Sequence, residues 1–175
     1  MRKFIAVFAV TLAALAGTVT SASAATTGET VTTFAVSADS SGLAITVPVS
    51  KNLGSGAPGS SISTTLGAVT VSDTRALLLG NWTASVSATD FSHATVTGAN
   101  GTIGAANVSY SPGTASASSG LPAAGAGGSL EQSRTAFSRT GVGNSSATWD
   151  PTVTVSVPAQ AVGGTYSGTI THSVA

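Results

Sequence analysis

The side chains best suited to covalent or acid–base chemistry are scattered singly along this 175-residue chain. His93 lies three residues after Asp90 and serine is abundant, so the residue types of a serine-nucleophile triad are all present. The motifs that position such a serine, a G-x-S-x-G elbow or an S-x-x-K sequence, do not occur. The six carboxylates are spread one at a time, without the pairing that glycoside hydrolysis requires. We therefore expect no enzymatic activity.

The histidines and carboxylates also give no sign of a metal site. His93 and His172 fall in different predicted strands, with no carboxylate at ligand spacing beside them. The sequence contains no cysteine, which excludes both thiolate ligands and a disulfide framework. We therefore expect no metal, no cofactor, and a fold that depends on core packing for its stability.

A small group of residues around Trp82 is a better candidate for binding. Asp73 and Arg75 lie two residues apart along a predicted strand, so their side chains point to the same side. They are expected to form a surface salt bridge, or else Arg75 lies over Trp82 as a cation–π partner. Trp82 begins the next strand, where it either fills the core or lies at the sheet rim and stacks on sugars. The binding hypothesis places Trp82 at the sheet rim, where Asp73 and Arg75 assist it in contacting the ligand.

His172 is the fourth candidate binding residue. It is in phase with Ile170 and Val174 in an alternating segment, so its side chain faces the core if that of Ile170 does. The expected role is then that of a hydrogen-bonded interior histidine, and ligand contact is the alternative.

Alternating apolar and polar residues define the elements that must position these side chains. The clearest signal is Val69–Phe91, where two alternating runs joined by a leucine-rich bend predict paired antiparallel strands. Glycine, proline and serine predict a hairpin turn at Asp39–Gly42, a loop at Lys51–Ser61 and a mobile surface loop at Ser111–Ser129. Further strands are predicted at Thr32–Val36, Leu43–Val49, His93–Thr97, Ile103–Tyr110, Leu130–Thr140, Val153–Val157 and Tyr166–Val174.

These short strands predict an all-β protein. About nine strands separated by turn residues, with no helical periodicity beyond the first residues, indicate an antiparallel β-sandwich. A Greek-key, immunoglobulin-like arrangement is the prediction, and a jelly roll is the alternative.

The first 24 residues have the features of a secretory signal peptide. Arg2 and Lys3 supply the positive charge, Phe4–Ala16 is apolar, and Ala22–Ala24 is a small-residue cleavage site. The apolar run is shorter than the about 20 residues that a membrane-spanning helix needs. We therefore expect residues 1–24 to be removed on export and residues 25–175 to form one domain without a membrane span.

Charge is scarce throughout the chain. Charged residues make up 7% of the sequence, whereas ordinary soluble domains have roughly 25%. Without the two basic residues of the leader, four basic residues face six acidic ones, which excludes a basic surface for nucleic acid. A polar surface with so little charge repels its neighbours weakly, as suits a crowded wall or an assembly.

Two segments resemble the WxL domain of Gram-positive surface proteins. The first is the V-x-V-x-D-x-R strand that ends at Arg75, followed by G-x-W-T-x-x-V-x-A-T-D-F beginning at Gly80. The second is the terminal G-T-Y-S-G-T-I-T-H-S-V, preceded by TVTVSVP at Thr152–Pro158. At the two motif positions this sequence has Trp82-Thr83-Ala84 and His172-Ser173-Val174, so only the first keeps the tryptophan of the family.

The resemblance implies a secreted protein that attaches non-covalently to the cell wall, with peptidoglycan as its ligand. The bias toward alanine, glycine and threonine is typical of an actinobacterial protein. The chain shows no hydrophobic tail and no sorting sequence, so we expect non-covalent retention at the surface. The alternative function is a structural or self-assembling surface subunit, which pairs with itself or with another surface protein through weakly defended strand edges.

Overall fold

A computed structural model describes residues 42–175 of the chain, and these residues form short antiparallel strands. The predicted strand at Thr32–Val36 and the turn that begins at Asp39 lie outside the described residues. Eight strands belong to the first layer: β1 (Leu43–Thr46), β2 (Ser61–Thr65), β3 (Val69–Asp73), β7 (Val108–Ser111), β8 (Ala115–Ser119), β10 (Gly128–Ser129), β12 (Ser145–Trp149) and β13 (Thr152–Ser156).

The remaining strands make up the second layer. They are β4 (Trp82–Ala88), β5 (Phe91–His93), β6 (Thr102–Ile103), β9 (Ala123–Ala124), β11 (Arg134–Arg139), β14 (Tyr166–Ser167) and β15 (Ile170–Val174). Two single 3-10 turns, η1 (Ala99–Gly101) and η2 (Ala105–Asn107), lie beside β6 and β7. Neither of these helical turns, the only ones in residues 42–175, is long or apolar enough to cross a membrane.

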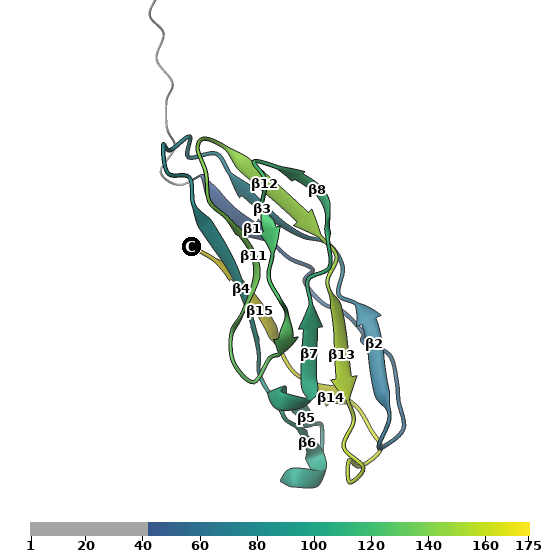
Figure 1. The fold of residues 1–175 in the computed structure, drawn as a ribbon. Helices are drawn as coiled ribbons and strands as arrows, with labels where there is room; N and C mark the ends of the chain where they lie inside the picture. The colour runs from purple at the N-terminus through teal and green to yellow at the C-terminus, as the bar shows by residue number, and fades with distance from the viewer. Residues whose placement is uncertain (1–41) are drawn as a thin grey trace, which may run out of the picture. The chain divides into compact units, whose positions relative to one another are not determined.

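Each layer is interrupted at its middle and so consists of two hydrogen-bonded sheets (Figure 1). In the first layer the strand orders are β1-β3-β12-β8 and β10-β7-β13-β2. The chain runs directly from β2 into β3, from β7 into β8 and from β12 into β13, so these sheets continue one another. In the second layer the orders are β15-β4-β11-β9 and β14-β5-β6, with β4 leading into β5 and β14 into β15.

Proline and glycine produce the interruption in the first layer. Pro151 separates β12 from β13, and a proline has no N–H to donate to a neighbouring strand. Its carbonyl instead accepts a hydrogen bond from the Leu66 N–H at 2.8 Å, and the Asp150 carboxylate accepts one from the Gly67 N–H at 2.9 Å. Gly67 has a φ of 105°, which a residue with a side chain rarely adopts.

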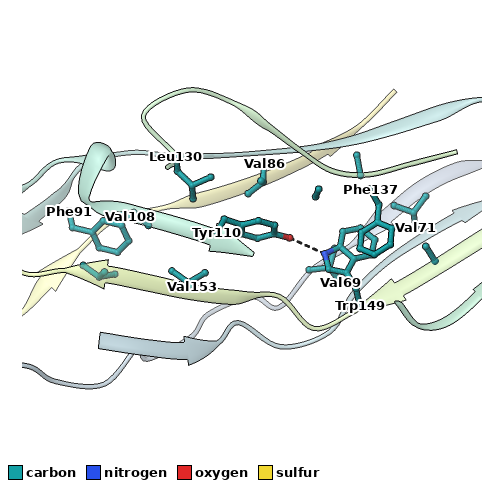
Figure 2. Close-up of a cluster of buried hydrophobic side chains, with 14 of the residues drawn as sticks. Val69, Val71, Val86, Phe91, Val108, Tyr110, Leu130, Phe137, Trp149 and Val153 are labelled. Carbon is teal, nitrogen blue, oxygen red and sulfur yellow. Dashed lines mark hydrogen bonds between the residues drawn. The ribbon is translucent and has the colours of Figure 1, made fainter. Parts of the chain in front are cut away.

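The core lies between the two layers (Figure 2). The alternation predicted for β4 is observed, because Trp82, Ala84 and Val86 are all buried while Thr83 between them is exposed. Trp149 of β12 faces Phe137 of β11, with ring centroids 4.5 Å apart. Burying aromatic side chains of this size accounts for much of the stability of a small sandwich.

The predicted fold class is confirmed, since the described residues form an antiparallel all-β sandwich. The Greek-key arrangement stays a prediction. Several strands are observed close to their predicted positions: β4, β11, β13, and the pair β14 and β15 within Tyr166–Val174. The predicted strand at His93–Thr97 is wrong, because the strand here is Phe91–His93 and ends where the prediction begins.

The interpretation of Ser111–Ser129 as a surface loop is wrong. This segment contributes β8, β9 and β10 to three different sheets. Its small residues show little alternation between apolar and polar types. In β8 the reason is that this edge strand has one neighbour and four of its five residues are exposed, so it needs almost no apolar side chains.

Candidate functional site

Asp73 and Arg75 form an ion pair at the end of β3. The guanidinium Nε and Nη2 atoms of Arg75 donate to the two carboxylate oxygens of Asp73 at 2.9 and 3.1 Å. Nη2 also donates to the Asn81 carbonyl at 2.8 Å. The hydrogen bonds from Arg75 hold the pKa of Asp73 below its usual value of 3.8.

The expectation of a surface salt bridge needs correction. Asp73 is in phase with Val69 and Val71 on β3, and it is only 1% exposed. The pair therefore lies at the edge of the core, where it connects β3 to the loop at residues 76–81. Such a carboxylate stabilises the loop and is not free to bind a ligand.

Trp82 lies in the core. Its exposed fraction is 2%, and its indole N–H donates to the Ser145 hydroxyl at 2.9 Å. The position at the sheet rim that the binding hypothesis required is therefore not observed. Trp82, Asp73 and Arg75 do lie close together, as predicted. Their polar groups, however, are bonded to other groups of the protein: Asp73 to Arg75, and Trp82 to Ser145.

Arg139 supports the same end of the sandwich and was not among the predicted site residues. It is 5% exposed, and its guanidinium donates to four backbone carbonyls from three loops. Nη1 donates to Gly80 at 2.6 Å and to Gly143 at 3.0 Å, Nη2 to Val142 at 2.6 Å, and Nε to Gly120 at 3.1 Å. A planar cation with several fixed N–H groups suits this task, because carbonyls from different loops approach it in one plane.

His172 is placed differently from the other three candidates. It lies on β15, half-buried, and its Nε2 is 3.0 Å from the Tyr110 hydroxyl. Tyr110 in turn accepts a hydrogen bond from the Trp149 indole N–H at 2.9 Å (Figure 2). This hydrogen-bonded row, Trp149–Tyr110–His172, runs from the centre of the core to the edge of the second layer.

Burial shifts the acid–base properties of this row. It lowers the pKa of His172 from 6.5 to about 4, so the imidazole is neutral at pH 7. It also raises the pKa of Tyr110 to about 12, which keeps the hydroxyl proton in place. In the neutral tautomer that carries its proton on Nδ1, Nε2 accepts a hydrogen bond from Tyr110, whose oxygen accepts the one from Trp149.

His172 lines a groove that runs beside β14 and β15. The groove consists of two adjoining cavities of about 540 and 260 Å³, a size typical of ligand sites. The segment 47–58 forms one wall, and β14, β15 and the loop before them form the other. Lys51, Leu53, Phe91 and Gly168 line both cavities, which makes the groove continuous.

The walls of the groove combine aromatic rings with backbone polar groups. Tyr166 is held in place, because its hydroxyl lies 3.0 Å from the Asn100 carbonyl and 2.9 Å from that of Val162. Its ring meets the His93 ring edge-on, with centroids 5.2 Å apart. Gly168 must lack a side chain here, since a Cβ atom at this position would lie 2.8 Å from the Phe91 ring.

Among the described residues 42–175, Lys51 is the one charged residue that lines the groove, and no aspartate or glutamate of this range does so. The groove therefore has one positive charge, where its two cavities adjoin, and no carboxylate among residues 42–175 that could act as an acid or base there. Nor, within residues 42–175, do three His, Asp or Glu side chains come together in a way that could hold a metal ion.

The fold and the groove together define the class of protein: an antiparallel β-sandwich with a mixed aromatic and polar groove at the edge of its layers. Comparison with protein-family models, with curated proteins and with solved structures finds no match for this chain. The resemblance to WxL domains stays a prediction from the sequence motifs.

Proposed function

We propose that this protein is exported and attaches non-covalently to the bacterial cell wall by binding peptidoglycan in the groove beside β14 and β15. The observation that carries the proposal is the lining of the groove. Among residues 42–175 it offers the half-buried ring of Tyr166, the ammonium group of Lys51 and many backbone and hydroxyl groups, without a carboxylate, while the Phe91 ring beneath is 9% exposed.

This lining matches the chemistry of a wall glycan. Sugar rings have apolar faces that stack on aromatic side chains, and their hydroxyls bind backbone carbonyls and N–H groups. The peptide stems of peptidoglycan end in carboxylates, which a lysine where the two cavities adjoin attracts. The lack of acidic residues favours binding over cleavage, because glycoside hydrolysis commonly needs two of them.

The proposal moves the contact surface away from Trp82. The indole ring, Asp73 and Arg75 are occupied within the protein, so they contribute by shaping the fold. Of the four residues proposed from the sequence, His172 is the one that lines the groove, at the position where WxL domains have their second tryptophan.

Replacing Lys51 by glutamate tests the proposal. Lys51 is exposed, so the Lys51→Glu protein should fold normally, but its carboxylate would repel those of the peptide stems. We expect retention on purified, protein-free walls to fall by about tenfold, roughly 1.4 kcal/mol of binding free energy. The measurement is the bound fraction in a sedimentation assay over a range of wall concentrations.

Two further variants separate the groove from general charge effects. Arg134→Glu makes the same change of charge at an exposed arginine outside the groove, and should retain full binding. Ser55→Trp fills the groove from an exposed position in segment 47–58, and should abolish binding without changing charge. Equal losses for Lys51→Glu and Arg134→Glu, or full retention of Ser55→Trp, would show that the groove is not the site.

A further inference from the structure

The outer edge of β14 and β15 presents backbone N–H and C=O groups to the groove. In an antiparallel pair of strands, alternate residues direct these groups toward the neighbouring strand, and the residues between them direct theirs away. Within residues 42–175, β14 pairs only with β5 and β15 only with β4, so each strand has one open side. The observed hydrogen bonds show which residues point to that side.

The odd-numbered residues of this stretch direct their backbone groups toward the neighbouring strand. The carbonyls of Thr165 and Thr169 accept hydrogen bonds, at 3.2 and 2.9 Å, from N–H groups of the residues that follow β5 and β4. Ala175 exchanges two hydrogen bonds with Thr83 of β4, at 2.8 and 3.1 Å. The backbone groups of the even-numbered strand residues therefore point outward, and three of these residues line the groove: Tyr166, Ile170 and His172.

An extended chain is the kind of ligand that pairs with such an edge. Strand addition supplies affinity through main-chain hydrogen bonds from the amide groups of the ligand. The edge from Tyr166 to His172 is about 20 Å long at roughly 3.3 Å per residue, and five extended residues span about 17 Å. In peptidoglycan the short peptide stem has this length and an amide at every link, whereas the glycan has amides only in its N-acetyl groups.

The side chains around this edge favour the stem over the glycan. Stacking on a sugar needs an open aromatic face, but both tryptophans and Phe91 are buried, which leaves the half-buried tyrosine of β14. Val47, Val49 and Val162 are exposed along the groove, where they suit the methyl groups of the alanines in the stem. Lys51 supplies the positive charge for a stem carboxylate.

We propose that the groove holds the peptide stem of peptidoglycan as an extended strand along the edge of β14 and β15. The inference rests on the wall binding proposed above and names the part of the wall that is recognised. Stems contain both D- and L-residues. A fully extended backbone is its own mirror image, so residues of either chirality offer their amide groups to the edge.

Walls and fragments that differ in their peptide test this assignment. The synthetic stem L-Ala–γ-D-Glu–L-Lys–D-Ala–D-Ala should bind in isothermal titration calorimetry and, in excess, release the protein from walls. Walls stripped of their stems by an amidase should retain at least about tenfold less protein. Full retention on stripped walls, or a stem that does not bind, overturns the assignment to the stem while wall binding stands. A protein that intact walls do not retain overturns the proposed function and this inference together.

N-methylated stems test the strand pairing itself. Every second amide of an added strand faces the edge, so N-methylation of the fourth residue and of the fifth should have unequal effects. One of the two should weaken binding by about three- to tenfold, as the loss of a hydrogen bond does, and the other by less than about twofold. Two equal effects would show that the stem does not pair with the edge.

Proline substitutions complete the test within the protein. Ile170→Pro removes an N–H on the open side of β15 within the groove, and Val174→Pro removes one on the same side beyond the groove. Neither N–H is directed at β4, and proline is tolerated at such edge positions. With unchanged circular-dichroism spectra, Ile170→Pro should weaken stem binding by about three- to tenfold and Val174→Pro should not. Equal binding by the two variants would contradict the proposal.

Discussion

Replacing Arg139 by methionine is expected to lower the free energy of unfolding by about 3–5 kcal/mol, as the loss of a buried hydrogen-bonded charge does. The substitution leaves four backbone carbonyls without their donor: that of Gly80, whose bond to Arg139 is buried, and those of Gly120, Val142 and Gly143, whose bonds are partly buried. Each unpaired buried carbonyl carries a desolvation cost. The measurement is urea-induced unfolding followed by intrinsic tryptophan fluorescence.

Two other arginine variants make this prediction specific. Arg139→Lys keeps the positive charge but offers one ammonium group in place of the guanidinium. Its free energy of unfolding should therefore lie between those of the wild type and Arg139→Met. Arg134→Met removes an exposed arginine that has a single bond to the Ser129 carbonyl at 2.9 Å, and should change stability by less than about 0.5 kcal/mol. An Arg139→Met protein within about 1 kcal/mol of wild type would contradict the role we assign to this residue.

Lowering the pH from 7 to 4 is expected to destabilise the protein through His172. The pKa of this residue is about 4 in the folded protein and 6.5 when unfolded, so the unfolded chain binds the proton more tightly. The stabilisation is therefore fully present above pH 6.5 and is lost as the pH falls toward 4. At roughly 1.4 kcal/mol per pKa unit, a shift from 6.5 to about 4 corresponds to about 3.5 kcal/mol. Solvent screening of this half-buried side chain reduces the expected loss to about 2–3 kcal/mol.

The His172→Gln variant isolates this effect. Glutamine offers an oxygen to the Tyr110 hydroxyl but does not titrate, so the variant should lose less stability between pH 6.5 and 4.5. Carboxylates such as Asp73 titrate mainly below this window and contribute equally to both proteins. If the free energies of unfolding of wild type and His172→Gln fall in parallel over this range, His172 is not the titrating group. Among residues 42–175, the ionisable groups that face it or share its groove are Tyr110, Tyr166 and Lys51.

The sequence predicts the strands whose alternation involves large side chains. Trp82 and Val86 alternate with polar residues in β4, and Val69 and Val71 do so in β3, so these strands were identified with their buried faces. The sequence does not predict the strand β12, because Ser145 and Ala147 occupy two of its three inward positions and only Trp149 is a large apolar side chain. Ser145 is buried for a reason outside its own segment: its hydroxyl accepts the hydrogen bond of Trp82.

The groove and the network around Arg139 depend on segments that are distant in the sequence. Arg139 binds carbonyl groups, which every residue has, so no residue type around Gly80 or Gly120 marks these partners. In the same way, Lys51 and Tyr166 line one groove only because β14 and the segment 47–58 cover the same edge of the sandwich. The ion pair of Asp73 and Arg75 could be predicted because its two members lie only two residues apart in the sequence, at the end of β3.

The row of hydrogen bonds from Trp149 through Tyr110 to His172 gives the protein an internal optical reporter. The indole of Trp149 is wholly shielded from water, yet only one hydroxyl separates it from an imidazole at the groove wall. A molecule bound against the His172 imidazole is expected to change the electrostatic environment of the buried Trp149 indole. Occupancy of the groove can therefore be followed from the emission wavelength of tryptophan fluorescence, without attaching a dye.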